Sequence, residues 1–180
     1  MIEKISGDFE LGDDSVSIVA HRDTRGELAE LFREDKRGGL RLRQWNLVRN
    51  NANVMRGMHV HPVHADFIVV IQGDMLLALH DVRPDSPGRG KSGIFRLAGD
   101  NLNAVYVPPG VVHGFYIPRG NLMVYGLSNE WSMDDEFACK WNDPGLRLIW
   151  PESINPVISE RDRNAGTLAE LTASYLAATA

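Results

Sequence analysis

The chain has 180 residues, of which 43% are hydrophobic and 24% are charged, and its formal net charge at pH 7 is -5. These values fit one globular domain with a sizeable core, and the negative charge argues against nucleic acid or an anionic membrane as a partner. A single cysteine, Cys139, excludes an internal disulfide. The first residues include acids and no apolar signal core, and no apolar run is long enough to span a membrane, so we expect a cytoplasmic location.

Strand patterns dominate the chain, and turn residues separate them. Strands are predicted over 15–20 and 43–50. The run 66–82 predicts two apolar strands on either side of a hairpin turn at Gln72-Gly73-Asp74. A further strand is predicted within 103–110, followed by a pair of strands that flank Arg119-Gly120-Asn121.

Helical patterns are confined to two places. A short helix is predicted over 27–34, and a C-terminal helix follows Thr167, which has the spacing of a capping box with Glu170. Many short strands with turns between them indicate an all-β antiparallel barrel or jelly roll, which can hold one small ligand. We expect a single domain over 1–180, with a core at about 40–150 to which the N-terminal strands and the C-terminal helix are appended.

The stretch RGMHVHPVHAD, residues 56–66, contains three histidines. His59 and His61 are two residues apart, so on a strand they share a face, which we expect to be the barrel interior. A polar pair in such an interior needs a partner or a function. Three interpretations are open: metal ligands, a base that moves protons, or histidines without a chemical role.

The metal interpretation depends on spacing. His59, His61 and Asp66, followed later by Pro108-x-Gly110-x-x-His113, resemble the two motifs of metal-binding cupins. That resemblance would make His59, His61, Asp66 and His113 the ligands of one divalent transition metal. The sequence departs from those motifs in having Asp66 where glutamate is usual, Asn53 in place of a glycine and Ile117 in place of an asparagine.

A longer pattern resembles the dTDP-4-dehydrorhamnose 3,5-epimerase family, whose members invert carbons in nucleotide-linked 4-keto-6-deoxy sugars. Five segments resemble the family's motifs in the correct order: DTRGELAELF, RQWNLVRNNANVMRGMH, VPPGVVHGF, WNDPGLRLIWP and ISERDRNAGTL. The resemblance implies a double-stranded β-helix jelly roll of the cupin type, and a homodimer that exchanges strands between its subunits.

The resemblance also implies roles for individual residues. His59 would be the base that removes the proton next to the sugar ketone, and Asp162 would orient it; a carboxylate on the other nitrogen fixes the imidazole tautomer. His113 would contact the ketone or the hydroxyls beside it. The remaining contacts would be Arg56, Gln44 and Asn46 to the sugar or diphosphate, and Arg25 and Glu30 to the nucleotide, in the partner subunit's site.

Several positions depart from the family pattern. Trp131 lies where the family has its proton-donating tyrosine, and an indole cannot exchange a proton in this chemistry, which leaves Tyr125 and Tyr116 as possible substitutes. The other replacements are Asp66 for a phosphate-binding lysine, His61 and His64 for two glutamines, and Leu28 for an aromatic residue that stacks on thymine.

Three functions follow as hypotheses. The preferred one is an epimerase or isomerase of a nucleotide-linked 4-keto-6-deoxy sugar, with His59 as base, Asp162 as its carboxylate and no cofactor. The second is a metal-dependent cupin that acts on a small polar substrate. The third is a sugar-nucleotide-binding relative that has lost catalysis.

Overall fold

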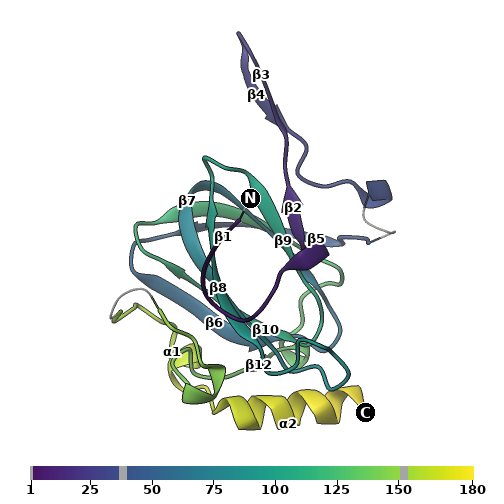
Figure 1. The fold of residues 1–180 in the computed structure, drawn as a ribbon, viewed down its shortest axis with the longest axis vertical. Coiled ribbons are helices and arrows are strands. Elements are labelled where there is room, and N and C mark those ends of the chain that lie inside the picture. Colours follow the sequence, from purple (N-terminus) through teal and green to yellow (C-terminus); the bar gives the residue numbers. More distant parts are fainter. Residues whose placement is uncertain (1, 37–39, 151–153) are drawn as a thin grey trace.

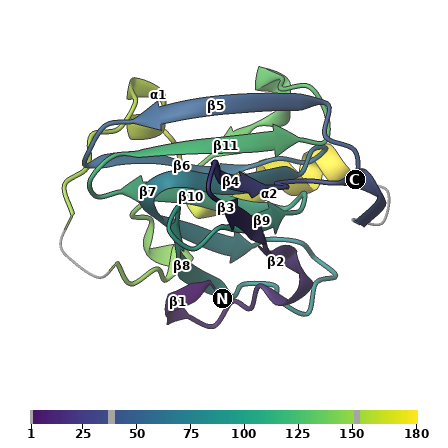
Figure 2. The same cartoon turned by 90° about the horizontal axis from the view of Figure 1, so that it is seen from above.

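The computed structural model describes residues 2–36, 40–150 and 154–180 (Figure 1). Two facing antiparallel sheets form a barrel and share one long strand, β7 (Asp66–Asp81). The first sheet has the order β1 (Glu3–Gly7), β8 (Ser92–Ala98), β7, β10 (Val111–Ile117), β6 (Val54–Val60) and β12 (Phe137–Ala138). The second has the order β2 (Ser15–Ser17), β9 (Asn103–Val107), β7, β11 (Asn121–Leu127) and β5 (Gln44–Asn50). Figure 2 shows β5, β11 and β7 running alongside one another.

The predicted hairpin at residues 72–74 is wrong, because β7 runs through it as one strand of 16 residues. Gly73, whose φ is +76°, lies where β7 passes from the second sheet to the first. A register shift against β11 changes which residues face inward: Ile68 before the bend and Met75 after it both belong to the interior core. A glycine between two apolar runs is compatible with a hairpin or with a bulged bend, and closure of the barrel selects the bend.

The predicted helix over 27–34 is also wrong. The strands β3 (Ala20–Asp23) and β4 (Gly26–Ala29) form a hairpin that extends away from the barrel, and a 3₁₀ helix, η2 (Glu34–Lys36), follows it (Figure 1). The turn is stabilised where the backbone N–H of Arg25 donates to Asp23 Oδ1 at 2.8 Å. The residues of this segment favour a helix, but intrinsic helix propensity is a weak preference, and pairing with the strand at 20–23 outweighs it.

The other predicted elements are found. Residues 43–50 contain β5, residues 103–110 contain β9, and residues 113–129 contain β11 and all but the first two residues of β10. The predicted strand at 15–20 is divided between β2 and the start of β3. The C-terminal helix is α2 (Leu168–Thr179), and Thr167 and Glu170 form the capping box. The remaining short helices are η1 (Gly12–Asp14), η3 (Met133–Asp135), η4 (Pro144–Leu146) and α1 (Glu160–Arg163).

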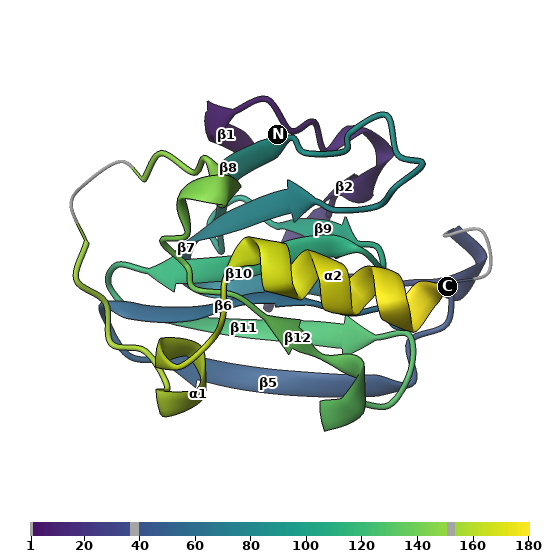
Figure 3. The same ribbon diagram turned by 90° about the horizontal axis from the view of Figure 1, so that it is seen from below.

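Apolar side chains pack in three places. One core fills the barrel between the sheets and includes Leu77 and Phe95. A second lies on the outer face of the first sheet, where Leu171 and Tyr175 of α2 cover it (Figure 3). A third, around Phe67, lies on the outer face of the second sheet. Among the described residues, no helix is long and apolar enough to cross a membrane.

Candidate active site

A cavity of about 540 Å³ opens inside the barrel and combines apolar walls with charged and imidazole side chains. Its polar lining comes from distant parts of the chain and includes Arg56 and His59 of β6, His113 of β10, Tyr125 of β11 and Asp162 of α1. A concave, largely apolar site with a few convergent polar groups is the usual form of a small-molecule site.

Strand alternation explains why the histidines face the cavity. On β6, Met58 and Val60 belong to the outer core beneath α2, whereas His59 and the following His61 line the cavity. The prediction that His59 and His61 share an inward face is therefore confirmed.

His59 is joined to Asp162 by a short hydrogen bond. Its Nε2 lies 2.8 Å from Asp162 Oδ1, although the two residues are 103 positions apart. Asp162 is buried in α1, where its backbone N–H donates to the N-cap Ser159 at 3.0 Å. Burial alone would raise the pKa of Asp162, but the hydrogen bond and charge of His59 outweigh it and hold this pKa below its ordinary value. The structure thus brings together the two residues that the sequence predicted as a catalytic pair.

Glu136 lies on the other side of the His59 ring. Glu136 Oε1 is 3.7 Å from His59 Nδ1, and Glu136 Oε2 accepts a hydrogen bond of 3.0 Å from Trp131 Nε1. Arg161 pairs with the same carboxylate. Burial tends to raise the pKa of Glu136, yet the neighbouring His59, Trp131 and Arg161 keep it below its ordinary value. Sequence analysis missed Glu136 and Arg161; the acidic run that follows Trp131 was the only signal for Glu136.

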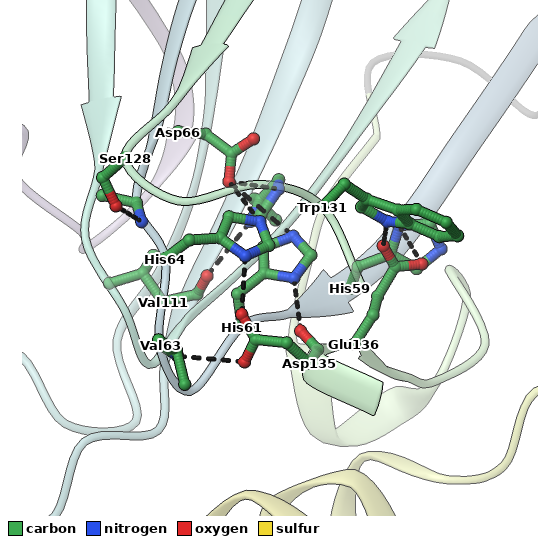
Figure 4. Close-up of polar contacts among 12 residues, drawn as sticks. His59, His61, Val63, His64, Asp66, Val111, Ser128, Trp131, Asp135 and Glu136 are labelled. Carbon is green, nitrogen blue, oxygen red and sulfur yellow. Dashed lines mark hydrogen bonds and ion pairs between the residues drawn. The ribbon is translucent and has the colours of Figure 1, made fainter. Parts of the chain in front are cut away.

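Four buried side chains form a separate group deeper in the cavity, which we call the histidine cluster: His61, His64, Asp66 and His113. The rings of His61 and His64 are stacked with centroids 3.9 Å apart, and Asp66 and Asp135 lie on opposite sides of them (Figure 4). The predicted metal set of His59, His61, Asp66 and His113 is not brought together as such. His59 turns to Asp162 and Glu136, and His64 joins the converging groups instead.

The two tyrosines considered as proton donors lie on opposite sides of the barrel wall. Tyr125 lines the cavity, and burial raises its pKa. Tyr116 packs against Trp150 in the outer core, and its hydroxyl donates to Asn53 Oδ1 at 3.0 Å. Tyr125 is therefore the tyrosine of this pair that can reach a ligand in the cavity.

Some of the predicted substrate contacts line the cavity, and others do not. Arg56 and His113 line the cavity, and Arg56 Nε donates to Asn50 Oδ1 at 2.8 Å. Gln44 and Asn46 hydrogen-bond each other at 3.1 Å and are not among the residues that line the cavity. Gln44 does act on the site indirectly, because its Oε1 accepts a hydrogen bond of 2.9 Å from the backbone N–H of Trp131, which lines the cavity.

Arg25 and Glu30 lie outside the cavity of their own chain. Arg25 occupies the tip of the β3–β4 hairpin, where its side chain is 88% exposed and pairs with Asp23. Glu30 pairs with Arg33 at 3.6 Å. A contact from either residue to a ligand would have to involve another subunit.

Fold and site together define a jelly-roll cupin whose cavity holds a hydrogen-bonded His–Asp pair. The family model described as dTDP-4-dehydrorhamnose 3,5-epimerase matches residues 14–170. The chain belongs to this family.

Individual relatives agree with that assignment. The chain is 31% identical over 160 residues to a dTDP-4-dehydro-6-deoxyglucose 3-epimerase of a Streptomyces species, covering 84% of this chain and 82% of the relative. It is 30% identical over 172 residues to a dTDP-4-dehydrorhamnose 3,5-epimerase of Mycobacterium tuberculosis, covering 89% and 85%. Among solved structures, it resembles ChmJ, a 3'-monoepimerase from Streptomyces bikiniensis in complex with dTDP-quinovose, with a TM-score of 0.80, 32% identity and coverage of 91% and 86%.

Proposed function

We propose that this protein is an epimerase or isomerase of a nucleotide-activated 4-keto-6-deoxy sugar, and that His59 removes the proton from the carbon next to the ketone. The observation that carries the proposal is the 2.8 Å bond between His59 Nε2 and Asp162 Oδ1 inside the cavity. Membership of the epimerase family supports the substrate class, since relatives with this fold are named as epimerases of dTDP-linked keto sugars.

The bond supports a separate role for each nitrogen of His59. Because a carboxylate accepts hydrogen bonds, Nε2 carries the proton and Nδ1 keeps its lone pair for the substrate. When Nδ1 takes a proton from carbon, the imidazolium is stabilised by Asp162 on one side and by Glu136, 3.7 Å from Nδ1, on the other. Tyr125 and water are the available donors for returning a proton to the opposite face of the sugar.

Two arginines at the cavity are suited to an anionic group of the ligand. Arg56 and Arg161 both line it, and a guanidinium matches the geometry of phosphate oxygens. His113 also lines the cavity, but its Nδ1 is engaged with the carbonyl of Val111 at 3.2 Å. We therefore assign the diphosphate to Arg56 and Arg161, and the sugar to the space beside His59.

Exchange of carbon-bound hydrogen with solvent tests this function. Incubation with dTDP-4-dehydro-6-deoxyglucose in heavy water is expected to place deuterium at C3 or C5 of the sugar, as measured by mass spectrometry and NMR. The matched control is dTDP-glucose, which lacks the ketone that acidifies these positions and should not exchange. Stabilisation by the keto sugar without any deuterium uptake would favour a binding protein over an enzyme.

We also propose a homodimer in the cytoplasm. The β3–β4 hairpin extends from the barrel, and β5 pairs with β11 alone among the described strands, so both offer surface to a second subunit. Leu28 on the hairpin and Leu47 on β5 are 68% and 62% exposed. Analytical ultracentrifugation should give a dimer for the wild type and a shift toward monomer for Leu47→Glu; a monomer at all concentrations would contradict this part. The buried free thiol of Cys139 suits a reducing compartment.

A further inference from the structure

The histidine cluster has an arrangement of hydrogen-bonding groups that the proposed proton transfer does not use. Three imidazole Nε2 atoms point at one oxygen, Asp66 Oδ2: those of His61 at 3.7 Å, His64 at 3.9 Å and His113 at 3.7 Å. These separations exceed a hydrogen bond, which is about 2.7–3.2 Å for nitrogen and oxygen. Among the described residues, neither His64 Nε2 nor Asp66 Oδ2 has a hydrogen-bond partner, although both atoms are buried.

The opposite nitrogen of each ring is already held. His61 Nδ1 bonds the backbone carbonyl of Asp135 at 3.0 Å, and His64 Nδ1 bonds the carboxylate of Asp135 at 2.6 Å. His113 Nδ1 bonds the carbonyl of Val111 at 3.2 Å. All three partners are acceptors, so each Nδ1 carries the ring proton and donates it, and each Nε2 presents a lone pair to the centre.

Burial isolates that centre from water. The side chains of His61, His64, Asp66 and His113 are all buried, and the ring protons are held on the Nδ1 atoms. Among the described residues, no donor reaches Asp66 Oδ2, so lone pairs face a buried carboxylate oxygen. Such an arrangement is costly unless a cation neutralises it.

We propose that His61, His64, Asp66 and His113 bind one divalent transition metal ion. Ligand bonds of about 2.0–2.1 Å place neighbouring tetrahedral ligands about 3.4 Å apart, so the three separations between Asp66 Oδ2 and the imidazole nitrogens need to contract by only a few tenths of an ångström. One ligand atom each from His61, His64 and Asp66 already lie within 4.8 Å of one another. Three imidazoles and one carboxylate suit Zn²⁺, Fe²⁺, Co²⁺, Ni²⁺ or Mn²⁺ better than Ca²⁺ or Mg²⁺, which prefer oxygen ligands.

The proposed site does not use His59, which remains bonded to Asp162. The ligand set that the cupin spacing suggests differs, because it includes His59 and lacks His64. Metal binding itself does not depend on the proposed function. A role for the ion does rest on that function: with four protein ligands the ion would have no open position for the ketone, but its charge in the same cavity as His59 would favour the enolate that forms from the substrate.

Metal content tests the site directly. Tag-free protein purified without added metal should contain bound transition metal by inductively coupled plasma mass spectrometry. After chelation, it should take up one equivalent of Zn²⁺ or Co²⁺ per chain, with a rise in melting temperature and cobalt absorption bands typical of nitrogen and oxygen ligands. Less than about a tenth of an equivalent bound, and no change in melting temperature with either ion, would overturn the proposal.

Variants distinguish the two possible ligand sets. His64→Asn and Asp66→Asn should lose stoichiometric metal, whereas His59→Asn should keep it. His80→Asn is the matched control, because His80 is also buried but bonds Ser92 Oγ at 2.7 Å, outside the cluster. Retention by His64→Asn with loss by His59→Asn would refute the proposed ligands. If the wild type binds metal but neither the loaded nor the metal-free form exchanges solvent deuterium, the proposed function fails and the metal site stands.

Discussion

Two walls of one cavity use histidine in opposite ways. At the first wall, His59 has a carboxylate bonded to Nε2 at 2.8 Å and a second carboxylate 3.7 Å from Nδ1, and its side chain is 20% exposed. At the second wall, the histidine cluster is almost completely buried, and its Nε2 atoms face a carboxylate oxygen that has no donor in the described part of the chain.

The difference lies in where the protons are. The partially exposed ring of His59 can exchange a proton with a substrate, because Asp162 and Glu136 stabilise the charge it gains. The buried rings of the histidine cluster have their protons fixed on Nδ1 by Asp135 and Val111, so they offer the lone pairs of Nε2. The first wall is suited to moving protons and the second to holding a cation.

The largest expected effect is on the first wall. His59→Asn should reduce deuterium incorporation into the keto sugar by about 10²–10⁴-fold, since it removes the base while it keeps a polar side chain of smaller size. Binding of the sugar nucleotide, measured by calorimetry, should change little. Exchange at the wild-type rate would show that a group other than His59 is the base.

Asp162→Asn should lower exchange by about 10²-fold, less than the loss of His59 itself. The amide can still occupy the position, but it no longer stabilises the imidazolium or fixes the tautomer with Nε2 protonated. Steady-state kinetics should show the loss in kcat, with KM nearly unchanged. A purely structural role for Asp162 would leave kcat per folded molecule intact, whatever the change in thermal stability.

Tyr125→Phe should lower the ratio of inversion to hydrogen exchange by about tenfold. This is less than the 10²–10⁴ typical of losing a positioned acid, because water that enters the cavity can donate the proton in place of Tyr125. Tyr116→Phe is the matched control, since that hydroxyl bonds Asn53 outside the cavity. NMR of the product stereochemistry, together with deuterium uptake, separates the two rates. Equal effects of both substitutions would remove Tyr125 as the donor.

The two walls should change the free energy of unfolding in opposite directions as the pH rises. Asp162 has a lowered pKa, so it stabilises the fold above its ordinary value of 3.8, and this contribution disappears as the pH falls through the folded value. Asp66 has a pKa raised from 3.8 to about 6. Its contribution to the stability of the fold is therefore complete below pH 3.8 and is lost as the pH rises through 6.

Two substitutions test this contrast in chelator, by urea unfolding at pH 5 and pH 8. At pH 8, Asp66→Asn should stabilise the metal-free protein by about 1–3 kcal/mol, and the gain should shrink at pH 5. Asp162→Asn should destabilise by about 1–3 kcal/mol at both values, because it removes the negative charge of the carboxylate that accepts the hydrogen bond from His59. Destabilisation by Asp66→Asn at pH 8 would mean that this carboxylate has a donor even without a metal.

Local patterns in the sequence determined much of the molecule. The alternation of side chains along a strand placed His59 and His61 on one inward face. The spacing of Thr167 and Glu170 marked the start of α2. Both features depend on residues only a few positions apart. Five motifs in order indicated the family and its jelly roll. Local patterns failed where they fit two structures equally well, as at Gly73, where β7 bends and does not turn back.

Contacts across the barrel were decided only by the tertiary structure. The bond between His59 and Asp162 joins positions 103 residues apart, and resemblance alone had suggested it. Nothing nearby in sequence showed that Glu136 would face His59, or that His64 would replace His59 in the histidine cluster. Such contacts depend on how two sheets close around a shared strand, and closure is a property of the whole chain that no short segment encodes.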